Sequence, residues 1–181
     1  MKITGLLGLA LLGACSAPGP VADADATLIT FNDFEGGGGW SNDPGRNNPS
    51  LVAKGQAHSG QYALRVDRDH EFSLTFDMPL GKISRGKFKT VHLEAWVFMP
   101  NAQATAAIGL QVVQPDGTIA VNGNDIKFGE AVKKYNEWVP VSTDFVLPDD
   151  IIPAQHLRLF MWRGNASEEA LLDDVKLSIK N

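Results

Sequence analysis

The residues best suited to chemistry in this 181-residue chain are its histidines. Catalytic metal sites commonly hold histidines at fixed spacing, as in H-E-x-x-H. The four histidines, His58, His70, His92 and His156, do not fall at such spacing, and no serine lies in a G-x-S-x-G sequence. His92 and Glu94 would form a lyase or hydrolase site with Arg158 if their strands lay side by side. We predict a protein without enzymatic activity and keep that cluster as the alternative.

Aromatic side chains offer a second kind of chemistry, which is stacking on the apolar faces of sugar rings. The candidate stacking platforms are Trp96, Phe98 and Trp162. Polar neighbours would bond the sugar hydroxyls, and these candidates are Glu94, Arg158, Gln111 and His92. The alternative is that a loop, such as residues 36–49, covers the aromatic side chains, which would then form a second small core. An exposed aromatic surface would also suit contact with another protein.

The N-terminal residues predict export and lipid attachment. Lys2 precedes an apolar run over residues 3–12, and two small residues come directly before Cys15. This order is typical of a signal peptide, and its ending resembles the lipobox of bacterial lipoproteins. We predict a signal peptide over residues 1–14 and acylation, such as palmitoylation, of Cys15, the only cysteine in the chain. An ordinary secretory signal with a spare cysteine is the alternative.

The segment after Cys15 predicts a tether and a location in the cell envelope. Residues 16–26 are small and acidic and include proline, as in a flexible linker. We expect the lipidated cysteine and tether over residues 15–26 and one folded domain over residues 27–181. Ser16 resembles the sorting signal for the outer membrane of Gram-negative bacteria. The net charge of −5, without a basic patch, argues against a nucleic-acid partner.

From residue 27 onward the pattern predicts an all-β domain, namely a two-sheet β-sandwich. The chain is 44% hydrophobic and contains 18 Gly and 10 Pro, a composition typical of a turn-rich globular protein. Short alternating runs are separated by Gly, Pro, Asn and Asp, and no stretch shows a helical stripe. The expected strands cover residues 28–34, 51–54, 61–67, 72–77, 90–98, 107–114, 138–146, 156–162 and 171–179, with a hairpin turn at 115–117.

Alternation along these strands predicts which side chains face the core, because successive side chains of a strand point to opposite faces. Every second residue of 91–97 and of 157–161 is apolar and of core size. The intervening residues, Trp96 and Trp162 among them, must therefore point outward. A globular domain gains more by burying aromatic side chains than by exposing them. We accordingly expect Trp96 and Trp162 to share one ligand-binding surface.

Four segments together resemble a known family. They are Phe34-Glu35 with the glycines and Trp40 that follow, the run AHSGQYALRV over residues 57–66, Trp138 with Val141 and Phe145, and the run LDDVKL over residues 172–177. This spaced pattern resembles the carbohydrate-binding modules of the CenC type, which are galactose-binding-like jelly rolls. The resemblance extends from about residue 28 to residue 179. It implies a jelly roll that binds a glycan, with Trp138 at the start of a core strand.

The resemblance also implies a structural calcium ion near the junction of the first and last strands. Alternation over residues 171–179 would place Asp173 on the apolar face, where a carboxylate is costly unless it is paired or bound to a metal. Asp173 and Glu35 are the first candidate ligands, with Asp33 and Asp174 in reserve. Backbone carbonyls of residues 58–60 would complete the oxygen set that calcium prefers. The alternative is that Asp173 caps a turn or pairs with a basic residue.

These expectations combine into one prediction of function. The chain would be a bacterial lipoprotein held at a membrane by its lipid anchor, with a noncatalytic domain that binds a glycan or polysaccharide. The main alternative is an envelope lipoprotein with a structural or protein-interaction role and no sugar ligand. A polysaccharide-active enzyme is the third possibility.

Overall fold

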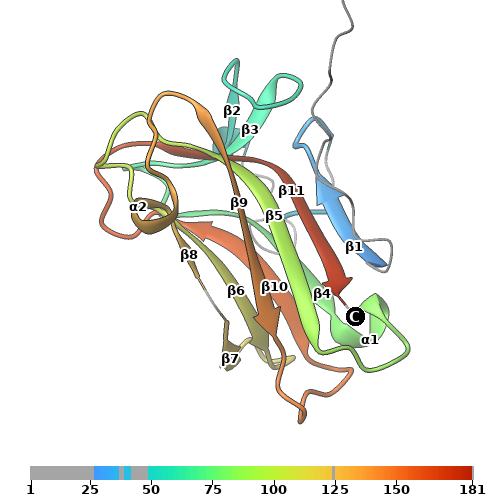
Figure 1. Cartoon of the computed structure of the whole chain (residues 1–181). Helices are drawn as coiled ribbons and strands as arrows, with labels where there is room; N and C mark the ends of the chain where they lie inside the picture. Colours follow the sequence, from blue (N-terminus) through green and yellow to red (C-terminus); the bar gives the residue numbers. More distant parts are fainter. Residues whose placement is uncertain (1–26, 37–38, 42–48, 124, 181) are drawn as a thin grey trace, which may run out of the picture.

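The computed structural model describes residues 27–36, 39–41, 49–123 and 125–180, which form two antiparallel sheets packed face to face (Figure 1). The strands are β1 (Thr27–Asn32), β2 (Val52–Lys54), β3 (Tyr62–Val66), β4 (Phe72–Pro79), β5 (Thr90–Phe98), β6 (Ala107–Val113), β7 (Ile119–Asn122), β8 (Ile126–Lys127), β9 (Trp138–Val146), β10 (His156–Trp162) and β11 (Ala170–Lys180). Single helical turns are η1 (Pro49–Leu51), α1 (Leu80–Ile83) and α2 (Phe128–Ala131). The predicted signal peptide, Cys15, the tether and most of the loop over residues 36–49 lie outside the described residues.

The prediction of an all-β sandwich is confirmed. Sheet A has the order β2-β3-β11-β5-β9, with β1 also paired to β11, and sheet B has the order β4-β10-β6-β7, with β8 paired to β6. β11 is therefore a central strand of sheet A, and β10 is a central strand of sheet B. Within the described ranges, no helix is long and apolar enough to cross a bilayer.

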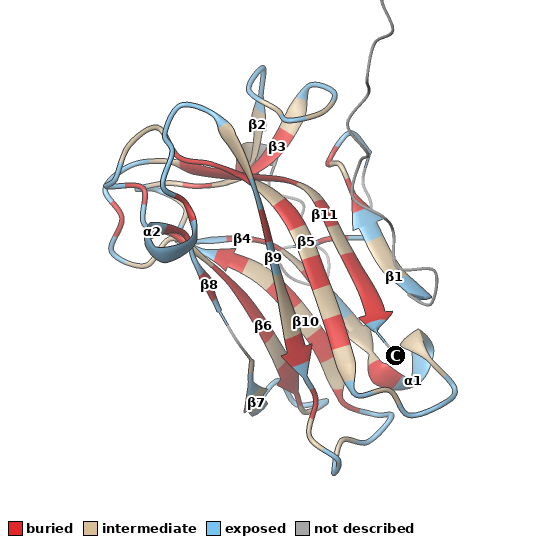
Figure 2. Ribbon diagram, viewed as in Figure 1, coloured by how far each residue is buried: buried red, intermediate tan, exposed pale blue. Residues whose placement is uncertain are grey.

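The inward-facing residues form the core as alternation predicted. Val91, Leu93 and Val97 of β5 are buried, and so are Leu157 and Leu159 of β10. Figure 2 shows buried and intermediate residues alternating along β5. The hairpin at 115–117 is present as well, but it leads into β7, which the sequence pattern did not predict. The short strand β8 was also not predicted.

Trp40 closes one region of the core, although it follows a run of glycines. Its side chain is 4% exposed and lies edge-on to Phe34, with ring centroids 5.5 Å apart. Its ring is also 6.1 Å from that of Phe76 on β4. The next residue, Ser41, exchanges two backbone hydrogen bonds with Thr75, which places this part of the chain along the edge of β4.

A bulge in β11 overturns the prediction that Asp173 faces the sandwich interior. Asp173 pairs with Trp96 and Lys176 pairs with Glu94, so β11 has one extra residue between these two pairs. Asp174 has φ 46°, which lies in the left-handed region. Because an extra residue reverses the alternation, Leu172 lies in the main core whereas Asp173 lies on the outer side of sheet A, beside Trp96.

A second bulge, in β4, determines which side chains lie beside β10. Phe160 pairs with Thr75 and Trp162 pairs with Phe72, so two residues of β4 lie opposite Met161. The hydroxyl of Ser73 accepts a hydrogen bond from the Met161 amide at 2.8 Å and donates one to the Leu74 carbonyl at 2.7 Å. The bulge therefore brings Phe72 to the outer side of sheet B, next to Phe160 and Trp162.

Candidate functional site

The predicted ligand-binding residues divide between opposite sides of the sandwich. Trp96, Phe98, Glu94 and His92 are on β5 of sheet A, whereas Trp162, Arg158 and Gln111 are on β10 and β6 of sheet B. The prediction that Trp96 and Trp162 share one surface is therefore wrong, and so is the prediction that Arg158 joins His92 and Glu94. Alternation correctly predicted that these side chains point outward, but it does not specify which sheet a strand enters.

The outer surface of sheet A, which we call the β5 face, is partly covered. The ring of His58 stacks on Trp96 at a centroid distance of 3.8 Å and an interplanar angle of 12°. Phe98 is buried in a small cluster with Ala63 and Leu171, and Trp138 packs against this cluster. Phe98 thus belongs to a second small core, and the loop that carries His58 partly covers Trp96. Most of residues 36–49 lie outside the described residues.

The uncovered part of the β5 face consists of ion pairs around a shallow hollow of about 700 Å³. Lys176 Nζ lies 2.7 Å from Glu94 Oε2 on the floor of this hollow. The His92 imidazole is hydrogen-bonded to Asp144 on β9, which also pairs with Lys180. Each charged group named here has a partner of opposite charge within the protein.

The outer surface of sheet B, which we call the β10 face, presents aromatic rings to solvent. Phe72 is 51% exposed and Trp162 is 43% exposed. Phe160 is on β10, which lies between β4 and β6, and its ring centroid is 5.9 Å from that of Phe72 in an edge-on arrangement. The Trp162 indole nitrogen donates to Glu71 at 3.3 Å, which orients its ring. Three aromatic side chains therefore line one end of the β10 face.

A charged cluster continues the β10 face along the same strands. Arg158 donates from Nε and Nη2 to one oxygen of Asp77, at 3.0 and 2.7 Å, and His156 bonds the other oxygen. Partial burial acts to raise the pKa of Asp77, but the hydrogen bonds from Arg158 and His156 outweigh it and hold the pKa below its usual value. On the other side of Arg158, Gln111 donates to Asn122 at 3.2 Å. Guanidinium, carboxylate and amide groups of this kind form hydrogen bonds with hydroxyls.

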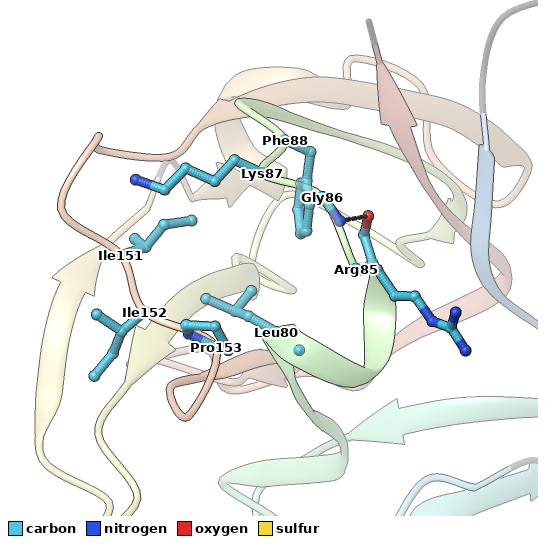
Figure 3. Close-up of a pocket in the computed structure, with 10 residues that line it drawn as sticks. Leu80, Arg85, Gly86, Lys87, Phe88, Ile151, Ile152 and Pro153 are labelled. Carbon is cyan, nitrogen blue, oxygen red and sulfur yellow. Dashed lines mark hydrogen bonds between the residues drawn. The ribbon is translucent and has the colours of Figure 1, made fainter.

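Two further hollows on the described surface differ in character. One, of about 360 Å³, lies beside Trp162 and is lined by Asp125, Lys127 and Glu130 among others. The other, of about 80 Å³, lies at the end of the sandwich between the α1 segment and the loop before β10 (Figure 3). Leu80, Phe88 and Ile151 contribute to this second pocket, which is mainly apolar. Of these two, the hollow beside Trp162 is the one that adjoins exposed aromatic and polar side chains together.

The carboxylates predicted to bind calcium instead hold the loop over residues 58–62. Asp173 Oδ2 accepts the amides of His58 and Ser59 at 2.7 and 3.1 Å. Glu35 Oε1 accepts the amides of Gln61 and Tyr62 at 2.7 and 2.6 Å. Asp174 Oδ1 accepts the Ser59 hydroxyl, and Asp33 Oδ1 accepts the amide of Glu35. No group of three or more acidic, histidine or cysteine side chains that could hold a metal ion is found in the described ranges. The calcium site stays a prediction.

Sequence reasoning missed three contributors to the β10 face, namely Phe72, Asp77 and Asn122. Phe72 is the first residue of a predicted strand, but the bulge that turns it outward is not visible as a pattern. Asp77 could have been found by extending alternation along residues 72–77, where it falls opposite the apolar positions Leu74 and Phe76. Asn122 belongs to β7, which was not predicted.

Comparison with known proteins shows the fold. No protein-family model and no curated sequence matches the chain. Solved structures do match, among them a family 22 xylan-binding domain of Xyn10C from Paenibacillus barcinonensis, with 18% identity, a TM-score of 0.58 and coverage of 88% of this chain and 99% of that one. A second match is the C-terminal family 22 carbohydrate-binding module of Xyn10B from Clostridium thermocellum, with 17% identity, a TM-score of 0.58 and coverage of 87% and 97%. The chain has the β-sandwich fold of carbohydrate-binding modules.

Proposed function

We propose that this chain is a lipid-anchored envelope protein that binds a polysaccharide, without catalysis at the binding surface, on the β10 face. The observation that carries this proposal is the group of exposed Phe72 and Trp162 with half-buried Phe160, beside the Arg158–Asp77 cluster. Aromatic rings with polar groups at their edges suit a sugar chain, because each sugar ring has apolar faces and hydroxyls around its rim. The β5 face differs, since His58 stacks on Trp96, Phe98 lies in a small buried cluster, and its hollow is lined by one exposed aromatic side chain, Phe31.

Xylan is the polysaccharide to test first. The family 22 module of Xyn10C is described as a xylan-binding domain, and Xyn10B, which contributes the other module, is described as an endo-1,4-β-D-xylanase. A second structure with the fold is named as a xylan-binding domain and has 17% identity to this chain, with a TM-score of 0.58. This likeness supports a choice of ligand only through the shared fold. The side chains of the β10 face decide affinity and specificity.

The binding test compares two tryptophans on opposite sides of the sandwich. Trp162→Ala should weaken binding of xylan by the full chain at least about tenfold, which corresponds to 1.4 kcal/mol. The melting temperature should change little, because surface substitutions usually alter stability by about 0.5 kcal/mol or less. Trp96→Ala is the matched control and should leave the affinity unchanged. Affinity electrophoresis on gels with and without xylan measures both variants.

Two results would contradict the β10 face as the binding surface. One is full retention of affinity in both Trp162→Ala and Phe72→Ala. The other is loss of affinity in Trp96→Ala with its fold intact, which would move the site to the β5 face. Absence of binding to a broad glycan array would instead favour a protein-interaction role.

Membrane attachment is a separate part of the proposal and depends on Cys15. Two acyl chains give stable anchoring, because each buried methylene contributes about 0.8 kcal/mol. The variant Cys15→Ala should accumulate as a longer precursor without lipid, and its xylan affinity should equal that of the parent chain. Intact-mass measurement of membrane-extracted protein tests this, and a mature mass without an acyl group would contradict the anchor. Fractionation of the envelope would then place the lipidated protein in the outer or the inner membrane.

A further inference from the structure

All four histidines of the chain are paired with an aspartate. In each pair Nδ1 of the imidazole faces a carboxylate oxygen, and the pairs are His58–Asp174, His70–Asp67, His92–Asp144 and His156–Asp77. His70 differs from the other three, because its second ring nitrogen also has a hydrogen-bond partner among the described residues. The hydroxyl oxygen of Ser50 lies 2.7 Å from His70 Nε2.

The carboxylate of Asp67 fixes the orientation of the His70 ring. Asp67 Oδ1 lies 2.7 Å from His70 Nδ1 and accepts the amides of Asp69 and His70, each at 2.9 Å. Burial acts to raise the pKa of Asp67, but hydrogen bonds from His70 and Asp69 outweigh it and keep the pKa below its usual value. An ionised carboxylate can only accept, so Nδ1 carries the proton. Nε2 is then an acceptor for the hydroxyl proton of Ser50.

The neighbourhood holds Ser50 in place on a short, partly accessible segment. Ser50 is half-buried in the single turn η1, and its carbonyl accepts a hydrogen bond from Arg65 Nε. The side chains of His70 and Asp67 are 18% and 20% exposed. Arg65 also lies 3.5 Å from Asp67 Oδ2 and from Glu169 Oε2. The three side chains are therefore partly exposed, and a guanidinium lies beside the serine main chain.

We propose that Ser50, His70 and Asp67 act as nucleophile, base and orienting acid in the hydrolysis of carboxylic esters. Serine, histidine and aspartate joined in this order perform acyl transfer on unrelated folds, and they are recognised by geometry and not by chain order. Ser50 Oγ attacks the ester carbonyl carbon while its proton passes to His70 Nε2. The bond to the alcohol oxygen breaks, and that oxygen takes the proton from His70. Water then attacks the acyl group on Ser50, gives one proton to His70 and releases the acid, and Ser50 regains its proton.

The position of this triad relative to the β10 face indicates which ester it would meet. His70 is followed by Glu71, whose carboxylate accepts the Trp162 indole N–H and whose carbonyl accepts the amide of Arg163. Phe72 is the next residue along the chain. The turn that carries His70 is thus tied to the aromatic end of the β10 face. The substrate would be an acyl ester carried by the bound polysaccharide. This assignment of the substrate rests on the proposed function.

The same chain contains a matched control with the same three residue types in another order. Ser59 Oγ donates to Asp174 Oδ1 at 2.7 Å, and His58 Nδ1 lies against Oδ2 of the same carboxylate. Here the aspartate lies between serine and histidine, so the Ser59 hydroxyl is bonded to a carboxylate and not to the imidazole of His58. Ser59→Ala should therefore leave ester chemistry unchanged, whereas Ser50→Ala should remove it.

The experiment uses two reagents that do not require glycan binding. The full chain is incubated with a fluorophosphonate probe and the labelled peptide is identified by mass spectrometry, while hydrolysis of p-nitrophenyl acetate is followed in parallel. We expect labelling at Ser50, loss of labelling in Ser50→Ala and His70→Asn, and at least a tenfold lower hydrolysis rate in Asp67→Asn. Ser59→Ala should equal the parent. Melting temperature and xylan affinity of each variant report whether it is folded.

The outcomes separate the two proposals. Absence of labelling on the folded parent chain, or labelling only at another serine, would overturn the triad whatever the result for xylan. Labelling at Ser50 without xylan binding would support the triad and remove the proposed function. Acetylated xylan tests the substrate: acetate release above the rate of Ser50→Ala supports a glycan ester, and no release by a chain that hydrolyses p-nitrophenyl acetate overturns that assignment.

Discussion

The ring of Phe160 lies over Gly109, its cross-strand partner on β6. A Cβ atom at position 109 would come within 3.2 Å of Phe160 Cζ and 3.3 Å of Cε2. The absence of a side chain at this position therefore lets the ring lie close to the sheet. The orientation of Phe160 against Phe72 depends on this contact. The height of the Phe160 ring above sheet B, on the β10 face, depends on it as well.

Gly109→Val should displace the Phe160 ring and weaken xylan binding about five- to tenfold, since an aromatic contact contributes on the order of 1 kcal/mol. The melting temperature should stay the same or rise slightly, because valine favours strands more than glycine does. Gly36→Val is the control, because a Cβ atom there meets nothing within 4 Å. Calorimetric titration of both variants measures the effect, and an unchanged affinity for Gly109→Val would show that Phe160 takes no part in binding.

Trp40→Ala should lower the free energy of unfolding by about 3 to 5 kcal/mol, the usual cost of truncating a large buried aromatic side chain. Trp40 is 4% exposed and packs against Phe34 and Phe76, so its removal leaves a cavity that the backbone cannot easily close. Urea unfolding followed by fluorescence measures this loss. A change below about 1 kcal/mol would mean that Trp40 does not close the core, and Trp162→Ala is the comparison for an exposed indole.

The stability contribution of Asp173 should decrease as pH rises from about 4 to about 6. Burial raises the pKa of this carboxyl to about 6 from an ordinary value of 3.8, although the amides of Ser59, Asp174 and His58 act in the opposite direction. Between these two values the folded chain binds more protons than the unfolded chain, so each rise in pH favours unfolding. Above about pH 7 the contribution should be constant.

This dependence is measured as the difference in unfolding free energy between the parent and Asp173→Asn, determined in urea at several pH values. The difference should move against the parent from pH 4 to pH 6. Asp116→Asn is a control of opposite sign, since hydrogen bonds from Thr118 lower the pKa of Asp116 and its contribution is lost as pH falls. A flat difference for Asp173→Asn would contradict a raised pKa.

Removal of divalent cations distinguishes the calcium prediction from the observed amide contacts. If Asp173 and Glu35 bound calcium, a chelator would lower the melting temperature and Asp173→Ala would abolish that effect. Because both carboxylates already accept amides of the 58–62 loop, we expect the same melting curve with and without chelator. Differential scanning calorimetry at matched ionic strength measures the melting temperature. A decrease of several degrees in the presence of chelator would support the calcium site.

The sequence by itself determined most of the strands and, outside the bulges, the outward direction of the side chains between core positions. Residues 90–98, 138–146 and 156–162 were predicted with the bounds that the structure shows. The prediction succeeds because side chains alternate between the two faces of a strand and burial of apolar side chains is favourable. The apolar positions of each strand therefore predict which face points to the core. The burial of Trp40 is likewise consistent with the size of its apolar surface.

Only the tertiary structure decided which strands share a sheet, where a bulge reverses alternation and which polar groups meet across loops. Trp96 and Trp162 look equivalent along the chain, yet β5 and β10 enter opposite sheets, and the His58 loop covers only Trp96. The bulges put Phe72 beside Trp162 and Asp173 beside Trp96. Likewise, 20 residues separate Ser50 from His70. Such contacts arise when distant segments pair. The free energy of each pairing depends on both segments, so the hydrophobic periodicity of one segment does not predict it.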